Sequence, residues 1–307
     1  MRLPDPALFA PYQGRMRTEV PLGTYSYALC GGPCAVLFET DGAEMLRDLA
    51  SACIRGGLPC RVLGGLSNVL VSDDGFDGVI LLNRKGTISH ETHPDGTVDL
   101  FAEAGTLMGQ LVRYCEENGI SGLEWAAGLP GTLGGAVIGN AGAFGGDIAS
   151  IFIGTDCLDR NGQVTRLDRD GMAFAYRASA LKGTNTGSVL LSAALRLEKG
   201  IPEQIREKGD ACRERRRSSQ PYGQPSLGSV FRNPEGMSAG KLIEDAGLKG
   251  TSVGKAVVSE KHANFIVTEK GVRAADYLAL VDLVRDRVLE NSGVLLEPEI
   301  ELLGFRE

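Results

Sequence analysis

Three polar side chains at distant positions have the chemistry needed to deliver a proton and to stabilise negative charge beside it. Ser229 supplies a hydroxyl in a loop bounded by glycine and proline. Arg177 lies among small and apolar residues, where a guanidinium requires an anionic partner. Glu299 supplies a carboxyl group in the run 297–299. No Ser/His/Asp elbow and no His-Glu-x-x-His helix accompanies them, so the set fits proton delivery and enolate stabilisation better than nucleophilic attack.

Each of these residues also has a purely structural interpretation. A serine between glycine and proline commonly forms a turn, and Glu299 would lie on the solvated face if residues 294–303 form one alternating strand. The basic run 213–217 is either a solvated helix face or a source of arginines for a ligand phosphate. These alternatives stay open at the level of sequence.

Three glycine-rich stretches, 64–68, 128–135 and 140–145, lie within about eighty residues of one another between apolar, strand-like runs. Glycine lets the main chain approach a ligand closely, and exposed N–H groups in such turns attract anions. A single cluster of this kind is typical of a plain tight turn, but three together favour a nucleotide or dinucleotide site. Neither the Rossmann nor the P-loop spacing is present, which favours a flavin fold with loops around the pyrophosphate.

Composition limits the possible partners and the compartment. The net charge of −7 argues against broad nucleic-acid binding, and no run of about 18 apolar residues is available to span a bilayer. No secretory signal is visible, and seven scattered cysteines fit a reducing cytoplasm. The single Cys-x-x-x-Cys of Cys30 and Cys34 lacks partner ligands, so no metal is expected.

Periodicity predicts an α+β protein in three domains: residues 1–84, 85–200 and 201–307. Asp95-Gly96 and Asn161-Gly162 each predict a hairpin in the second domain. The other expected elements fall into two sets. Strands are predicted over 33–40, 60–63, 79–82, 189–197 and 294–303. Helices are predicted over 45–54, 107–115, 202–217, 239–246 and 274–290.

Over residues 20–304 the chain resembles the UDP-N-acetylenolpyruvoylglucosamine reductases, also called UDP-N-acetylmuramate dehydrogenases. The motifs that carry the resemblance are specific in combination. They are Gly-Gly-Pro at 31–33, Ser67-Asn68, 128–135, 140–145, Tyr176-Arg177, 228–234, Gly-Lys-Leu-Ile-Glu at 240–244, His-Ala-Asn-Phe at 262–265 and Leu-Glu-Pro-Glu at 296–299.

The resemblance implies a fold of the vanillyl-alcohol-oxidase type, with FAD held non-covalently by the first two domains and the third domain over the substrate. It also implies NADPH as the electron donor and a UDP-sugar enolpyruvate as the substrate in a cytoplasmic step of peptidoglycan precursor synthesis. The residue matching Ser229 protonates the α-carbon, while those matching Arg177 and Glu299 stabilise the enol(ate). A monomer is expected, with no nucleic-acid partner and no membrane insertion.

The resemblance also implies residues for each ligand. The expected cofactor-binding residues are Gly64, Gly65, Leu66, Ser67, Asn68, Gly128, Pro130, Gly131, Gly135, Asn140, Ala141, Gly142, Ala143 and Gly145. The expected substrate-binding residues are Tyr176, Arg217, Asn233 and His262. The short segment from Arg177 to Ser229 fits the family branch that lacks an extra substrate loop, and Tyr222 is a candidate for the diphosphate contact which that loop supplies elsewhere.

Two departures from the family pattern define the alternatives. Leu66 replaces the second glycine of Gly-x-Gly-Ser-Asn, and the stretch 26–32 lacks the usual threonine, aromatic and basic residues. We therefore expect Leu66→Gly to tighten FAD retention, unless the loop has adapted to leucine. The alternatives are a related FAD oxidoreductase with another substrate, and a degenerate nucleotide-sugar-binding protein that has lost flavin.

Overall fold

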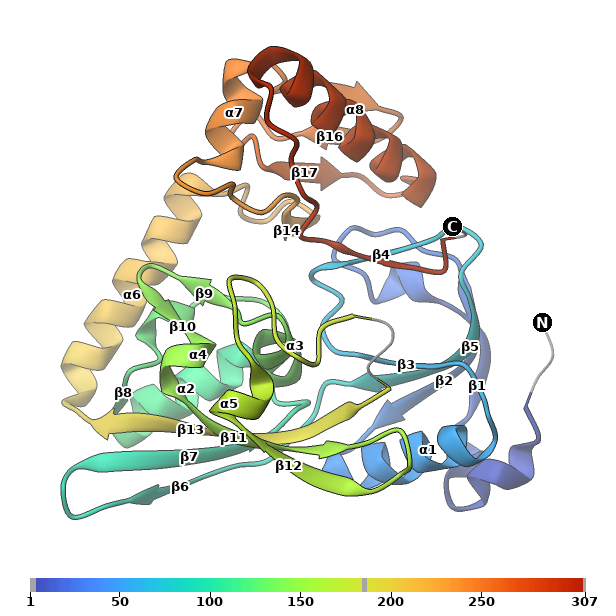
Figure 1. The fold of residues 1–307 in the computed structure, drawn as a ribbon, viewed down its shortest axis with the longest axis vertical. Coiled ribbons are helices and arrows are strands. Elements are labelled where there is room, and N and C mark those ends of the chain that lie inside the picture. Colours follow the sequence, from blue (N-terminus) through green and yellow to red (C-terminus); the bar gives the residue numbers. More distant parts are fainter. Residues whose placement is uncertain (1–3, 184–186, 306–307) are drawn as a thin grey trace. The chain divides into compact units, whose positions relative to one another are not determined.

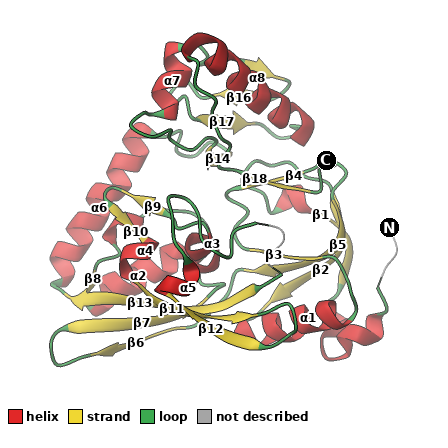
Figure 2. Ribbon diagram, viewed as in Figure 1, coloured by secondary structure: helices red, strands yellow, loops and turns green. Residues whose placement is uncertain are grey.

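The structure, a computed structural model, describes residues 4–183 and 187–305 (Figure 1). Its described residues belong to two compact units, each assembled from separate stretches of chain. The first unit comprises 1–17, 36–65 and 78–215, and the second comprises 18–35, 66–77 and 216–307. The division into domains at 84 and 200 stays a prediction. The α+β class is confirmed by both units, because each combines helices with mainly antiparallel sheets (Figure 2).

One core of the first unit forms where helix α1 (Ala43–Arg55) packs on a sheet. Strands β2 (Pro33–Thr40), β5 (Phe76–Asn83) and β3 (Cys60–Leu63) are neighbours in that order, and β3 runs parallel to β5. These strands and this helix were predicted. The helix turns a face of apolar residues toward the buried face of the strands, as its spacing requires. The buried members from α1 are Met45, Leu46, Leu49, Ala50, Ala52 and Cys53.

The other core of the first unit lies against an antiparallel sheet with the order β12-β11-β13-β7-β6, to which β8 adds by pairing with β13. The two predicted hairpins are confirmed, because β6 pairs with β7 and β11 pairs with β12. Helix α2 (Met108–Asn118) packs its apolar residues on this sheet. The strands are β6 (Ile88–Thr92), β7 (Thr97–Glu103), β8 (Ile120–Ser121), β11 (Phe152–Leu158), β12 (Val164–Asp168) and β13 (Val189–Lys199).

Short elements complete this part of the chain. They are α2 (Met108–Asn118), α3 (Leu133–Ile138), β9 (Gly142–Ala143), β10 (Gly146–Asp147), α4 (Ile148–Ile151) and α5 (Arg169–Met172). The helix α6 (Pro202–Ser219) follows β13, and its residues up to Arg215 belong to the first unit. Three 3₁₀ segments are also present among the described residues: Pro6–Arg15 and Glu124–Ala126 lie in the first unit, and Leu22–Thr24 lies in the second.

The second unit is built around helix α8 (Ala274–Ser292) and a sheet with the order β14-β17-β16-β15. The completely buried Tyr277 of α8 lies in its core. Asp73 accepts hydrogen bonds from the first two backbone N–H groups of α8, at 2.8 and 2.9 Å, and so begins the helix from a distant part of the sequence. The remaining elements are β1 (Arg17–Pro21), β4 (Val69–Val71), β14 (Ser226–Ser229), α7 (Ala239–Asp245), β15 (Ser252–Val253), β16 (Ala256–Val258), β17 (Phe265–Thr268) and β18 (Glu301–Leu303).

The prediction of one alternating strand over 294–303 is wrong. Only β18 is regular strand, and it pairs in parallel with β4. An alternating strand over 294–303 would bury Leu302, but Leu302 is 45% exposed and Leu303 is buried instead. The buried face is therefore shifted by one residue at this end. Pro298 forms only an isolated bridge to Phe231, because a proline has no N–H to continue a ladder.

In the described part of the chain no helix combines the length and the apolar character needed to cross a bilayer. Five of the seven cysteines are buried, and all seven are free thiols. They pack as small apolar side chains.

Candidate functional site

The first two glycine-rich stretches lie in close contact in the first unit. A Cβ atom added at Gly64 would stand 2.3 Å from Thr132 Oγ1, and one added at Gly65 would stand 2.9 Å from the Cα of Gly131. Only glycine therefore permits this approach. Thr132 in turn begins α3, since its hydroxyl accepts a hydrogen bond from Gly135 N–H at 3.4 Å. Two predicted cofactor segments thus pack directly against each other.

The third glycine-rich stretch forms a hairpin at the other end of α3. Strands β9 and β10 are joined by Phe144 and Gly145, whose φ angles of 52° and 89° are those of a type I′ turn. Asn140 is buried, and its amide holds the stretch in place. Its Nδ2 donates to the carbonyl of Ala175 at 2.9 Å, and its Oδ1 accepts from Ala149 N–H at 3.0 Å. The side chain of Asn140 therefore serves the protein's own structure.

Arg177 lies against this third stretch. Its Nη2 donates to the carbonyl of Gly142 at 2.9 Å, and its guanidinium lies 5.2 Å from the centre of the exposed Tyr176 ring. The two residues form a tight turn closed by paired hydrogen bonds of 3.1 Å between Ala175 and Ala178. The structure thus brings the predicted catalytic arginine to a predicted cofactor segment.

Backbone strain concentrates in these segments. Three predicted site residues, and Phe144 within the stretch 140–145, are non-glycine residues with φ in the left-handed region, which costs about 1 kcal/mol or more each. They are Leu66 at 49°, Asn140 at 42°, Phe144 at 52° and Arg177 at 56°. Strain of this kind persists where surrounding contacts fix the chain, and it clusters at ligand sites.

In the second unit, Ser229 and Glu299 lie on neighbouring segments. The N–H of Glu299 donates to the carbonyl of Val230 at 2.7 Å, and the N–H of Arg232 donates to the carbonyl of Glu297 at 2.9 Å. Ser229 is half-buried, and its hydroxyl has no hydrogen-bond partner among the residues that the structure describes. The structure therefore brings together two predicted catalytic residues that are 70 positions apart in the sequence.

Asn68 lies on the other side of the Glu299 segment. Its Nδ2 donates to the carbonyl of Glu299 at 3.0 Å. The unit boundary falls between Gly65 and Leu66, so Ser67 and Asn68 belong to the second unit while Gly64 and Gly65 belong to the first.

The predicted substrate residues of the second unit have distinct surroundings. The guanidinium of the exposed Arg217 lies 5.4 Å from the centre of the Tyr222 ring, which puts both candidates for a phosphate contact side by side. Asn233 is exposed, and its Oδ1 accepts a hydrogen bond from Ala239 N–H, at the start of α7, at 3.0 Å.

The imidazole of His262 is held by a near neighbour in the chain. His262 Nδ1 accepts a hydrogen bond from Asn264 N–H at 3.2 Å, so the ring's proton is assigned to Nε2. Burial lowers the pKa of His262.

The structural roles of Thr132 and Asn264 were not predicted from the sequence. Thr132 lies inside a glycine stretch, where it was one unremarked residue among several. Asn264 is buried and its side chain hydrogen-bonds to the segment that carries Ser229. The sequence showed only that Asn264 precedes an apolar strand. The contact of Thr132 with Gly64 and the bonds of Asn264 to Phe231 join positions far apart in the sequence, so no local spacing reveals them.

Leu66 is buried, with 2% of its surface exposed, and its backbone has positive φ. Leu66→Gly would relieve about 1 kcal/mol of backbone strain but remove about 2 to 3 kcal/mol of apolar burial. We therefore expect Leu66→Gly to lower the free energy of unfolding by about 1 to 2 kcal/mol in urea titrations. Its effect on FAD retention is measured separately, by the flavin content after gel filtration.

Leu66→Ala is the matched control for this prediction. It loses nearly the same apolar surface but keeps a Cβ at positive φ, so it should be less stable than Leu66→Gly by about 1 kcal/mol. An alanine variant as stable as the glycine variant would show that the backbone at this position is not strained.

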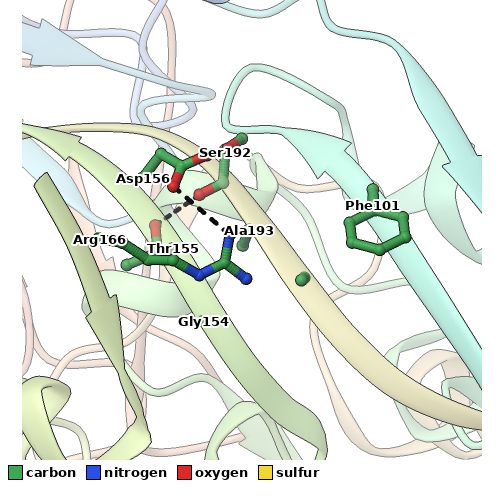
Figure 3. Close-up of a pocket in the computed structure, with 8 residues that line it drawn as sticks. Phe101, Gly154, Thr155, Asp156, Arg166, Ser192 and Ala193 are labelled. Atoms are coloured by element: carbon green, nitrogen blue, oxygen red, sulfur yellow. Dashed lines mark hydrogen bonds and ion pairs between the residues drawn. The ribbon is translucent and has the colours of Figure 1, made fainter. Parts of the chain in front are cut away.

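A separate small pocket lies on the sheet of β7, β11, β12 and β13 in the first unit (Figure 3). Ser192 Oγ donates to Asp156 Oδ2 at 3.2 Å, and Arg166 lies 3.7 Å from Asp156 Oδ1. None of the predicted site residues lines this pocket. The described residues also hold no group of three or more histidine, cysteine, aspartate or glutamate side chains placed to bind a metal ion.

The glycine surfaces of the first unit fall within a recognised cofactor domain. Residues 34–168 match the family model described as an FAD binding domain, and residues 220–303 match the C-terminal domain of UDP-N-acetylenolpyruvoylglucosamine reductase. The fold is therefore the vanillyl-alcohol-oxidase-type FAD-binding fold, and the protein is an FAD-dependent oxidoreductase.

Whole-chain relatives define the family further. The chain is 40% identical to UDP-N-acetylenolpyruvoylglucosamine reductase of Synechococcus sp. (strain RCC307), over 96% of each chain. It is 37% identical to the enzyme of the same name from Latilactobacillus sakei subsp. sakei (strain 23K), over 94% of this chain and 93% of that one. The crystal structure of the Thermus caldophilus enzyme superposes with a TM-score of 0.76 at 34% identity, covering 94% of this chain and 99% of that one. The chain belongs to the UDP-N-acetylenolpyruvoylglucosamine reductase family.

The residues present fit FAD. Gly64 and Gly65 bring their segment into close contact with 131–132, and a Cβ at Gly145 would meet no atom within 4 Å, so the backbone there is open. Bare backbone of this kind permits a pyrophosphate to approach main-chain N–H groups. The segments 64–65, 128–135 and 140–145 would hold the cofactor, and FAD would supply hydride transfer when bound.

Proposed function

We propose that the protein reduces UDP-N-acetylglucosamine enolpyruvate to UDP-N-acetylmuramate with NADPH as the electron donor, in a cytoplasmic step of peptidoglycan precursor synthesis, and that it acts as a monomer. The observation that carries the proposal is the pairing of the Ser229 and Glu299 segments within the family-matched residues 220–303. A proton donor and a carboxyl group held on adjacent backbone suit reduction of a carbon–carbon double bond conjugated to a carboxylate.

We assign each residue a chemical task. Ser229 holds the proton that goes to the α-carbon of the enolpyruvyl group, and its hydroxyl has no competing partner in the described chain. Arg177 and Glu299 stabilise the enol(ate), for which a guanidinium offers two parallel donors. Tyr176, Arg217, Asn233 and His262 contact the UDP-sugar, and Tyr222, beside Arg217, is the candidate for the diphosphate contact.

Anaerobic stopped-flow measurements on the purified holoenzyme test this function. NADPH should bleach the flavin absorbance, and UDP-N-acetylglucosamine enolpyruvate should restore it. A flavin that NADPH reduces but this substrate does not reoxidise would favour another substrate. Colourless protein that cannot be reconstituted with FAD would favour a nucleotide-sugar-binding protein. NADH in a parallel series defines the donor preference, and light scattering during gel filtration tests the monomer.

FAD should be bound without a covalent link. Neither 64–68 nor 128–145 contains a histidine or a cysteine to which a flavin could be tethered. Acid precipitation of the holoenzyme should therefore release the yellow cofactor into the supernatant. Flavin that remains in the washed pellet would contradict the prediction.

A further inference from the structure

Asn264 binds the segment that carries Ser229 through both ends of its side-chain amide. Its Oδ1 accepts a hydrogen bond from Phe231 N–H at 2.9 Å, and its Nδ2 donates to the carbonyl of Phe231 at 2.8 Å. Its own backbone carbonyl accepts from Val230 N–H at 2.8 Å. Asn264 is 4% exposed, so water cannot replace these bonds without a rearrangement.

Asn68 holds the segment that carries Glu299 from the opposite side. Its Nδ2 donates to the carbonyl of Glu299 at 3.0 Å, and its backbone carbonyl accepts from Glu301 N–H at 2.9 Å. Since Glu299 N–H donates to the carbonyl of Val230, the lateral order is Asn264, Val230, Glu299 and Asn68. Two asparagines therefore flank two predicted catalytic segments within one unit.

Side chains are needed here because regular strand pairing stops at this point. Strand β14 ends at Ser229, its register against β17 is shifted between Ser226 and Ser229, and Gly228 has a φ of 76°. Beyond Ser229 the ladder would leave the N–H and carbonyl of Phe231 without strand partners, although Phe231 is buried. The amide of Asn264 satisfies both groups as a neighbouring strand would.

We propose that Asn264 and Asn68 are positioning residues for the reduction of the enolpyruvyl substrate. Asn264 fixes the backbone from which the Ser229 hydroxyl projects, and Asn68 fixes the backbone that carries Glu299. This inference rests on the proposed function. It also assigns the side chain of Asn68 to a hydrogen bond with the protein backbone instead of to a contact with the cofactor. Neither residue touches the reacting atoms.

Asn264→Ala tests the first half of this inference in the holoenzyme. Reoxidation of NADPH-reduced flavin by UDP-N-acetylglucosamine enolpyruvate should slow about 10²-fold, the scale for a reacting group misplaced by about 1 Å. Flavin reduction by NADPH should keep its wild-type rate, because it does not use Ser229. Thr268→Val is the matched control, since Thr268 is also buried, at the end of the strand β17 that follows Asn264, and its hydroxyl donates to the carbonyl of Ala28 at 2.8 Å. It should lower the melting temperature yet leave both half-reactions unchanged.

A double-mutant cycle with Ser229→Ala separates positioning from general destabilisation. If Asn264 acts through the Ser229 hydroxyl, Asn264→Ala should slow reoxidation much less in the Ser229→Ala background than in the wild type. Additive effects, or equal slowing of both half-reactions in Asn264→Ala, would overturn the assignment.

Asn68→Ala tests the second half, and it decides the question if Asn264→Ala does not fold. The variant should keep its FAD through gel filtration and still reoxidise more slowly per bound flavin than the wild type. Loss of FAD with a normal rate per remaining flavin would make Asn68 a cofactor ligand and overturn the inference. Wild-type enzyme that this substrate does not reoxidise would instead refute the proposed function, so the two failures are distinguishable.

Discussion

Ser229→Ala should slow flavin reoxidation by the substrate, relative to flavin reduction by NADPH, by about 10² to 10⁴-fold, the usual contribution of general acid catalysis. Flavin reduction by NADPH needs only a hydride, so it should stay near the wild-type rate. Reoxidation needs a hydride on one carbon and a proton on its neighbour, so it should slow severely. Stopped-flow absorbance of the flavin measures both steps in one preparation.

Two further variants sharpen the test of Ser229. Ser226→Ala removes a hydroxyl from the same strand, β14, and should leave both half-reactions unchanged. Ser229→Cys should recover part of the lost rate, because a thiol also donates a proton. Equal slowing of both half-reactions in Ser229→Ala would contradict the role of Ser229 as proton donor. It would favour the structural interpretation, in which Ser229 forms a turn after Gly228.

Arg177→Lys should reduce the rate of substrate reduction by about 10²-fold or more, the scale for loss of one preorganised oxyanion donor. A guanidinium presents two parallel donors, whereas an ammonium is a point charge on a flexible stem. The structure adds a second demand, because one nitrogen of Arg177 already donates to the carbonyl of Gly142. A lysine cannot meet both demands at once.

The flavin content of the Arg177→Lys variant separates these two tasks. If the bond to Gly142 is the main task, FAD retention should fall while the rate per bound flavin stays normal. If enolate stabilisation is the main task, flavin reduction by NADPH and FAD content should persist while reoxidation slows. Arg55→Lys, at the exposed end of α1, is the control for a charge-conserving change. Near-normal turnover in Arg177→Lys would mean that the arginine is not needed for the reaction.

Local patterns in the sequence predicted most of the regular elements. Apolar spacing placed α1 and α8, strand-like runs placed β2 and β3, and Asp-Gly and Asn-Gly pairs placed two hairpins. These features depend on neighbours within a few residues, so the sequence alone carries them. Glycine clustering likewise indicated a flavin site before any contact was known.

The relation of Ser229 to Glu299 was decided only by the tertiary structure. Their pairing, the amide of Asn264 on Phe231 and the amide of Asn68 on Glu299 join positions that are 33 to 231 residues apart. The strand expected over 294–303 failed for the same reason, because its pairing depends on β4 and on Phe231. Side-chain alternation reports which face of a strand is buried, but the register and the partner are set by distant backbone that satisfies each N–H and carbonyl. Residue types and local spacing therefore determined which groups could do the chemistry, and long-range hydrogen bonding determined which of them meet.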